Sequence, residues 1–265
     1  MVIQVNAERE KNRMKATDIA VIGICAALYA VIGRLTDFGV TFIGVAFWPA
    51  AVIPAIFAAL YGPWVGGTSA AIGIFARDML AHGNPLLSLM AGVPPNFIMF
   101  FIIGYVSQRR FDMKKLKIGA LISVIVMVSG LLLPTLVLPA EFAAVTQGLS
   151  TWTIVAIFVS TVGSSLAAIA YVSKRWPEWR SYSIGSIIGQ GIGAAILSVM
   201  LWLYTQLFYS TLFPTPLQAS LIPAIFIWTF ATEIPFVLLI GPPVIQACYN
   251  AFPSLRRKET KSEDE

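Results

Sequence analysis

Long apolar segments separated by short polar ones run along most of the chain. They lie at residues 17–34, 44–62, 64–81, 88–107, 118–139, 151–173, 184–208 and 219–248. Apolar runs of about 20 residues are typical of membrane-spanning helices. The strands of a membrane barrel would alternate apolar and polar residues, whereas these segments are apolar on all sides. The pattern therefore predicts an all-α integral membrane protein, folded as a compact bundle of six to eight transmembrane helices.

The composition agrees with this class of protein. Hydrophobic residues make up 57% of the chain and charged residues only 12%, which excludes an ordinary soluble domain. We expect a cytosolic N-terminal tail at residues 1–16, a single transmembrane helical domain at 17–250, and a disordered cytosolic tail at 251–265. The first 15 residues lack the apolar core of a secretion signal.

Basic residues gather in four clusters, near 9–15, 109–117, 174–180 and 256–261. The other predicted loops, near 35–43, 82–87, 140–150 and 209–218, contain no lysine. Because positive residues favour cytosolic loops, eight spans with both termini in the cytosol place all four clusters inside. The sequence thus predicts a multi-pass protein of the cell (plasma) membrane. The net charge of +5 then reflects an orientation in the lipid bilayer, and we expect no nucleic-acid partner.

Two arginines fall outside the basic clusters. Arg34 lies at the predicted outer end of the first span and Arg77 toward the outer end of the third, and Asp37 and Asp78 lie close to them in sequence. Ionisable groups at membrane depth are costly and are therefore candidate functional residues. These four residues can be a salt-bridge cluster that fixes packing, with an arginine reaching the head groups. They can also be a ligand site near the outer surface, in which an arginine binds an anionic group.

Further polar residues follow Asp78 in the sequence. His82 lies four residues after it and so shares its helix face. It is the only histidine, so the sequence predicts no metal site. Asn84 before Pro85 is most simply a turn residue. Asn96 opens the fourth segment, where it can cap a helix or present its amide to a ligand.

Two residues elsewhere complete the candidate site. Glu233 is the deepest acid in the predicted spans, and is either a packing residue or a functional carboxylate. Trp48 is an aromatic residue that could stack on a ring of a ligand. The candidate substrate-binding residues are therefore Arg34, Asp37, Trp48, Arg77, Asp78, His82, Asn84, Asn96 and Glu233.

Motifs that would indicate an enzyme are missing. The sequence contains no glycine-rich nucleotide loop ending in Lys and Ser or Thr, no Gly-x-Ser-x-Gly elbow, and no zinc-ligand or paired-cysteine motif. We therefore expect no enzyme and no cofactor in this chain. A membrane protein without catalytic motifs, carrying an outward polar cluster, suggests binding and transport.

One stretch of the chain is similar to a known family. The run "GPWVGGTSAAIGIFARDMLAHGNPLLSLMAGVPPNFIMFFIIGYVSQ" resembles the central part of the substrate-binding (S) component of energy-coupling factor (ECF) transporters. The similar features are a glycine-rich helix that ends near Asp78, a helix that opens with Pro95 and Asn96, and the Gly104–Tyr105 pair that closes it. The first helix also contains Ala26-x-x-x-Ala30. In this family an alanine pair with that spacing docks the S component onto its transmembrane partner.

The resemblance implies a function and a set of partners. The chain would be the substrate-binding subunit of an ATP-driven importer of a vitamin-like small molecule. Its partners would be a coupling transmembrane (T) component and two cytosolic ATPase subunits, which use the ATP. The family core has six helices, and its ligand binds near the outer face, here around Arg34–Thr41. Two alternatives stay open on the residues alone: a self-sufficient proton-coupled secondary transporter, or a non-transport structural or assembly protein of the membrane.

Overall fold

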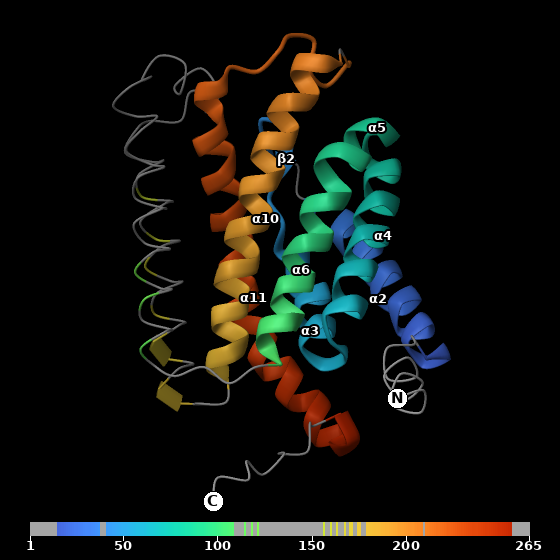
Figure 1. Cartoon of the computed structure of the whole chain (residues 1–265), viewed down its shortest axis with the longest axis vertical. Coiled ribbons are helices and arrows are strands. Elements are labelled where there is room, and N and C mark those ends of the chain that lie inside the picture. Colours follow the sequence, from blue (N-terminus) through green and yellow to red (C-terminus); the bar gives the residue numbers. More distant parts are fainter. Residues whose placement is uncertain are drawn as a thin grey trace, which may run out of the picture.

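The computed structural model describes residues 15–37, 41–108, 179–208 and 210–255, together with scattered single positions between 114 and 175. The predicted segments 118–139 and 151–173, and most of both predicted tails, lie outside the described residues. Within the described part, five long elements run alongside one another (Figure 1). They are α2 (Ala16–Leu35), α4 (Pro63–Ala81), α6 (Val93–Ser107), α10 (Arg180–Leu207) and α11 (Ile222–Ala251).

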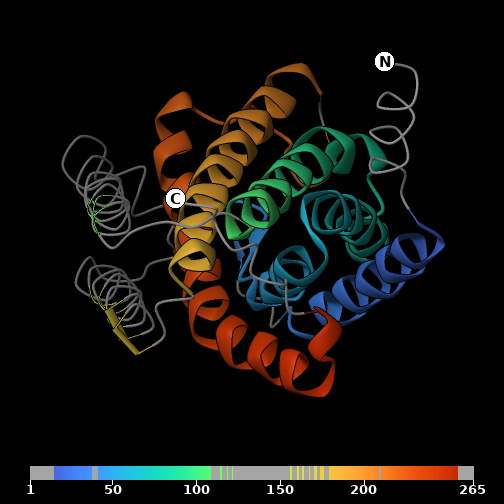
Figure 2. The same cartoon turned by 60° about the horizontal axis from the view of Figure 1, so that its bottom comes forward.

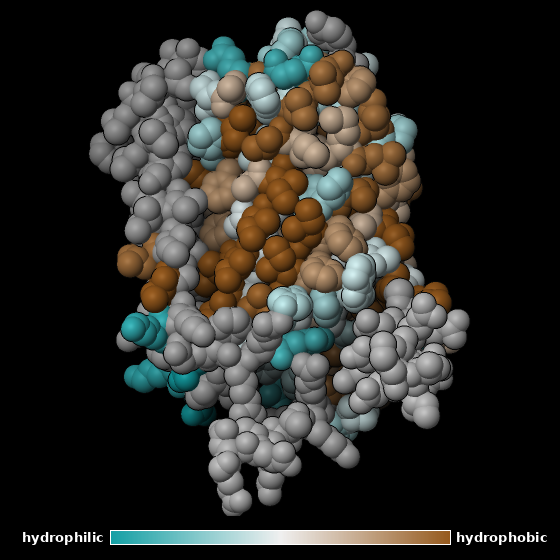
Figure 3. Space-filling model, viewed as in Figure 1, coloured by the Kyte–Doolittle hydropathy of each residue, from teal (hydrophilic) through white to brown (hydrophobic). Residues whose placement is uncertain are grey.

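Four stretches of the described residues are long and apolar enough to cross a membrane. They are Ala16–Leu35, Pro85–Ser107, Arg180–Leu207 and Ala219–Ala251. Figure 3 shows a brown apolar band across the middle of the molecule, with hydrophilic teal residues toward both ends. A band of this kind is what the hydrocarbon core of a bilayer requires of the helices that face it. The prediction of an all-α integral membrane protein is confirmed.

The predicted span at 44–62 is wrong in part, because it begins within a hairpin and its helical part starts only at Pro49. β1 (Thr41–Phe42) pairs antiparallel with β2 (Val45–Ala46). The turn between them uses positive φ angles, 50° at Ile43 and 76° at Gly44, which a helix cannot contain. The helical part is η1 (Pro49–Ala51) followed by α3 (Val52–Tyr61). At 1.5 Å per residue, the ten residues of α3 cover about half of the hydrocarbon core.

The tight turn predicted between the second and third segments is present. Gly62, with φ of 99°, separates α3 from α4, and the two helices approach closely because Gly66 has no side chain. A Cβ on Gly66 would overlap the Cβ of Ala58. The short α3 thus leads directly into a full-length α4, and the hairpin of β1 and β2 occupies the level that a longer α3 would have filled.

The fourth predicted span is helical with an irregular start. α5 (Pro85–Leu87) continues into a wider turn, η2 (Ser88–Gly92), before α6 begins at Val93. Pro94 and Pro95 have no N–H to donate, so the regular hydrogen-bond ladder cannot pass through them. In the same turn the Gly92 carbonyl accepts a 2.9 Å hydrogen bond from the Asn96 side-chain amide. This turn brings Gly92 and Asn96 to the same part of the bundle interior.

Three glycines set α10 against α6. A Cβ on Gly189 would lie 2.6 Å from the Met99 carbonyl oxygen, and one on Gly193 would lie 2.6 Å from the Met99 side chain. A Cβ on Gly185 would meet the Ile103 carbonyl at 3.1 Å. Small residues four apart let helix backbones approach this closely in membranes. The consequence is a fixed α6–α10 pair that forms one wall of the interior.

α11 crosses beside α10 and closes the bundle. It continues through Pro235, Pro242 and Pro243 to Ala251, and Figure 2 shows its C-terminal part bending away from α10 toward α3 and α2. Prolines inside a helix are the usual cause of such a bend. Tyr182 of α10 fits against Gly241 at this point and donates a 2.9 Å hydrogen bond to the Val237 carbonyl.

Candidate functional site

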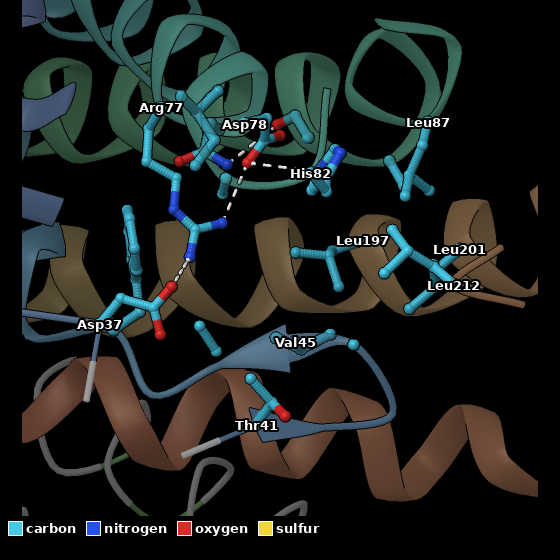
Figure 4. Close-up of a pocket in the computed structure, with 18 of the residues that line it drawn as sticks. Asp37, Thr41, Val45, Arg77, Asp78, His82, Leu87, Leu197, Leu201 and Leu212 are labelled. Carbon is cyan, nitrogen blue, oxygen red and sulfur yellow. Dashed lines mark hydrogen bonds and ion pairs between the residues drawn. The ribbon is translucent and has the colours of Figure 1, made fainter. Parts of the chain in front are cut away.

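A cavity of about 280 Å³ opens between the hairpin, the C-terminal half of α4, and α10 (Figure 4). One part of its lining is polar and another is apolar. The polar lining includes Asp37, Arg77, Asp78, His82, Asn96 and Glu233, and the apolar lining includes Leu87, Leu197, Leu201, Leu212 and Phe213. The C-terminal end of α4, which lines it, lies at the end of the bundle opposite the start of α2 and the end of α11 (Figure 1). The volume is near the lower limit for small-molecule pockets.

Arg77 is the central charge of the polar end. Its Nη2 donates to Asp37 Oδ2 at 2.6 Å, and its Nη1 donates to Asp78 Oδ1 at 3.1 Å. The guanidinium also lies over the Trp48 ring, 4.5 Å from the ring centroid, which is a favourable cation–π distance. The Arg77 side chain is only 11% exposed. These contacts tie the end of α2 to α4 through a nearly buried ion pair.

The second carboxylate of this cluster is held from three sides. Besides Arg77, Asp78 accepts a 2.7 Å hydrogen bond from the Ser88 hydroxyl, and its Oδ1 lies 3.8 Å from His82 Nε2. Ser88 comes from η2, so the cluster joins α4 to the wider turn as well as to α2. A carboxylate in this position satisfies most of its acceptor capacity within the protein.

His82 follows the last residue of α4 and has a defined tautomer. The Asn84 backbone N–H donates to His82 Nδ1 at 3.1 Å, so Nδ1 is an acceptor and the proton of the neutral ring is on Nε2, toward Asp78. Burial lowers the pKa of His82 below its ordinary value of 6.5; the Arg77 charge acts in the same direction and the Asp78 charge opposes it. The imidazole is therefore neutral at pH 7.

A chain of three buried side chains lies beside the cluster. Trp48 Nε1 donates to the Tyr29 hydroxyl at 2.7 Å, and that hydroxyl donates to Asn96 Oδ1 at 2.7 Å. Tyr29 has no exposed surface, and its ring packs edge to face with Trp48. This chain fixes the Trp48 ring that Arg77 covers, and it fixes the Asn96 amide at the cavity wall.

Glu233 and Gln190 bring α11 and α10 together beside the cavity. Glu233, on α11, is 5% exposed and lines the cavity. Gln190 of α10 lies beside its carboxyl group, has no exposed surface, and completes no hydrogen bond of good geometry with either amide atom. The salt bridges between described residues all involve Asp78 or Arg77, so no cation of the described part lies against Glu233.

Most of the residues proposed from the sequence come together at this cavity, and two do not. The residues that line it are Asp37, Trp48, Arg77, Asp78, His82, Asn96 and Glu233. Arg34 is exposed in the last turn of α2, where a cation is favoured by the helix dipole. Asn84 caps α5 by accepting from the Leu87 N–H at 3.0 Å and donates to the Tyr204 hydroxyl at 2.7 Å. These contacts agree with the interpretation of Asn84 as a turn residue.

The proposed docking alanines lie inside the bundle. Ala26 and Ala30 are each 5% exposed, on the face of α2 that packs on α4. A Cβ on Gly73 of α4 would lie 2.8 Å from the Ala26 carbonyl oxygen. This pair therefore serves the close approach of two helices of the same chain.

Several residues that line or support the cavity are not among those predicted from the sequence. Tyr29 is fully buried within an apolar run, where its hydroxyl needs a hydrogen-bond partner, and this need was an available signal. Leu197, Leu201 and Phe213 line the apolar part, but no sequence pattern separates them from other apolar residues. Among the described residues, no group of three or more His, Cys, Asp or Glu side chains is placed to hold a metal ion.

The fold and the site define a class of protein: a multi-pass helical membrane protein with a cavity, part polar and part apolar, that suits a small molecule. The sequence model of the family described as "ECF-type riboflavin transporter, S component" matches residues 13–173, more than half of the chain. The chain belongs to this family. It is a substrate-binding subunit of an ECF transporter in the plasma membrane, and it is not an enzyme. The matched range ends before α10. No curated protein and no solved structure matches the chain.

Proposed function

We propose that this S component captures a vitamin-like small molecule from outside the cell in the cavity described above, and that riboflavin is the first candidate. The family description is one support for the proposal. The observation that carries it is a cavity whose lining is polar in one part and apolar in another. Riboflavin has a flat apolar ring system with a polar edge and a chain of hydroxyls, and such a lining can bind both kinds of group.

The orientation supports uptake from outside. Lys15 precedes α2 and Arg180 begins α10, and both helices start at the end of the bundle away from the C-terminal end of α4, which lines the cavity (Figure 1). Positive residues favour the cytosolic side, so the cavity is at the outer end. With no nucleotide loop in the sequence, we propose that two cytosolic ATPase subunits use ATP to drive transport, and that a T component couples them to this chain.

A binding titration tests the ligand. We expect riboflavin fluorescence to be quenched on addition of the purified protein, with a stoichiometry of about one. Ala81 lines the cavity at the exposed end of α4, so Ala81→Trp should fill its entrance and weaken binding at least tenfold. Ile72→Trp is the matched control, because Ile72 is on the same helix, 51% exposed and outside the cavity. Equal binding by wild type and Ala81→Trp, or no binding by either, would reject this site for riboflavin.

We propose that the T component docks on a face of α2 adjacent to the one that contains Ala26 and Ala30. Ala26 and Ala30 are buried, whereas Ala20, Gly23 and Ala27 are exposed on one face. Nothing lies within 4 Å of a Cβ built on Gly23. A face of small residues lets a partner helix approach closely, and this one is open to the lipid.

Co-purification tests that surface. We expect Ala27→Trp to abolish co-purification with the T component while riboflavin binding is unchanged. Val199→Trp, at a 46% exposed position of α10, is the control for a bulky residue facing lipid. Retention of the T component by Ala27→Trp would show that docking occurs elsewhere.

A further inference from the structure

Four aromatic side chains form a continuous row on one side of the bundle, over α4 and α6. Phe97, Phe101 and Tyr105 are spaced four residues apart and so share a face of α6. The ring centroids of Phe97 and Phe101 are 5.8 Å apart, and those of Phe101 and Tyr105 are 6.4 Å apart. Trp64 of α4 packs edge to face against Phe101 at 5.1 Å. These four residues are called the aromatic ladder below.

Two glycines explain why the rings lie at the surface. A Cβ on Gly67 of α4 would lie 2.9 Å from the Phe97 carbonyl oxygen, and one on Gly104 of α6 would lie 2.7 Å from the Pro63 Cα. The backbones of α4 and α6 are therefore too close for large side chains to fit between them. The rings extend outward instead, and Trp64 is 60% and Tyr105 46% exposed.

The aromatic ladder changes in polarity along the helix axis. Its two phenylalanines lie further into α6, whereas Trp64 is in the first turn of α4 and Tyr105 in the last turn of α6. These two helix ends lie at the same end of the bundle as the starts of α2 and α10 (Figure 1). Among the described residues, the Trp64 indole N–H has no hydrogen-bond acceptor. Tryptophan and tyrosine favour the membrane–water interface, because each has an apolar ring with a polar group.

A partner helix and a lipid make different demands on such a surface. Close docking of helices in a membrane needs small residues, which α2 offers at Ala20, Gly23 and Ala27, whereas the aromatic ladder presents four large rings. Flexible lipid chains adapt to a ridged surface, and the head-group region contains oxygens that accept from N–H and O–H groups. The apolar band in Figure 3 extends over α6, so the aromatic ladder is continuous with the surface that faces the bilayer.

We propose that the aromatic ladder contacts phospholipids of the inner leaflet in the assembled transporter. Trp64 and Tyr105 lie at the level of the head groups, and Phe97 and Phe101 lie among the acyl chains. The aromatic ladder thereby fixes the depth of the bundle in the bilayer and leaves the small-residue face of α2 free for the T component. The assignment to the inner leaflet rests on the proposed orientation of the chain, and the lipid contact does not depend on the ligand of the cavity.

Fluorescence quenching by brominated lipids tests the contact. The signal of Trp64 is the difference in emission between wild type and Trp64→Phe, each reconstituted in phosphatidylcholine vesicles brominated either near the head group or near the chain end. We expect the bromines near the head group to quench this signal at least twofold more strongly. Trp179→Phe is the matched control, because Trp179 lies at the same end of the bundle but is only 6% exposed, so neither lipid should quench its signal.

Two introduced tryptophans test the order of depths. Phe97 and Tyr105 are eight residues apart, which is about 12 Å along a helix. In the Trp64→Phe background, the signal added by Phe97→Trp should be quenched more strongly by the bromines near the chain end. The signal added by Tyr105→Trp should be quenched more strongly by those near the head group.

Three outcomes would overturn the proposal. The first is absence of quenching at Trp64, and the second is equal quenching of Phe97→Trp and Tyr105→Trp by each lipid. The third is quenching of Trp64 that is lost when the T component and the ATPase subunits are added, because a protein partner would then cover the aromatic ladder. Riboflavin takes no part in the measurement, so failure of the proposed ligand is distinguishable from each of these outcomes.

Discussion

Removing the Arg77 side chain should lower the stability of the protein by an amount that can be estimated from its contacts. Arg77→Ala leaves Asp37 and Asp78, with side chains 15% and 9% exposed, without the cation that neutralises them. Breaking a buried ion pair by removing one partner costs about 3–5 kcal/mol, and loss of the contact with Trp48 adds about 0.5–2 kcal/mol. We expect the free energy of unfolding to fall by about 3–5 kcal/mol, because the two carboxylates can partly relax toward water.

The assay is unfolding in a denaturing-detergent titration, with flavin binding measured on the same samples. Arg77→Lys should recover only part of the loss, since an ammonium cannot span both carboxylates as the guanidinium does. Arg77→Met combined with Asp37→Asn and Asp78→Asn should recover more, because no charge is then left unpaired. If Arg77→Ala unfolds at the wild-type detergent concentration and binds ligand normally, the ion pair contributes nothing and the reasoning is wrong.

Three further predictions concern the support of the site. Tyr29→Phe should lower the free energy of unfolding by about 1–3 kcal/mol, because it leaves a buried donor and a buried acceptor unsatisfied; detergent unfolding measures this. Gly189→Ala should cost about 1–3 kcal/mol, since its Cβ would lie 2.6 Å from a backbone oxygen. By contrast, Gly191→Ala should stabilise by about 0.5–1 kcal/mol, because its Cβ would meet the Phe230 ring at an ordinary van der Waals distance of 4.0 Å. Because burial lowers the pKa of His82, stability should be full above pH 6.5 and fall as the pH drops through the folded-state pKa, and His82→Gln should flatten that slope.

The helices that are long and uniformly apolar could be predicted from hydropathy alone. The segments at 17–34, 64–81, 184–208 and 219–248 correspond to α2, α4, α10 and α11 within a few residues. The hairpin at Thr41–Ala46 could not, because its residues are as apolar as those of a span. Hydropathy predicts that a segment is shielded from water, and it does not distinguish a membrane-spanning helix from a hairpin that is packed inside the bundle. The positive φ angles at Ile43 and Gly44 distinguish them, and a single glycine in the sequence is a weak signal for such a turn.

In the site, too, the sequence predicts features that depend on one segment alone and does not predict those that depend on residues far apart in the chain. Arg77 and Asp78 could be identified because a charge at membrane depth is expensive wherever it points, and that cost is a property of one segment. Whether the charge remains available to a ligand depends on Asp37, which is 40 residues away in the chain, and on the Trp48 ring. An arginine among apolar residues suggests anion binding, but the same arginine between two carboxylates is already neutralised. The chemistry that a ligand meets is therefore determined by the groups that remain available after the protein has paired its own charges.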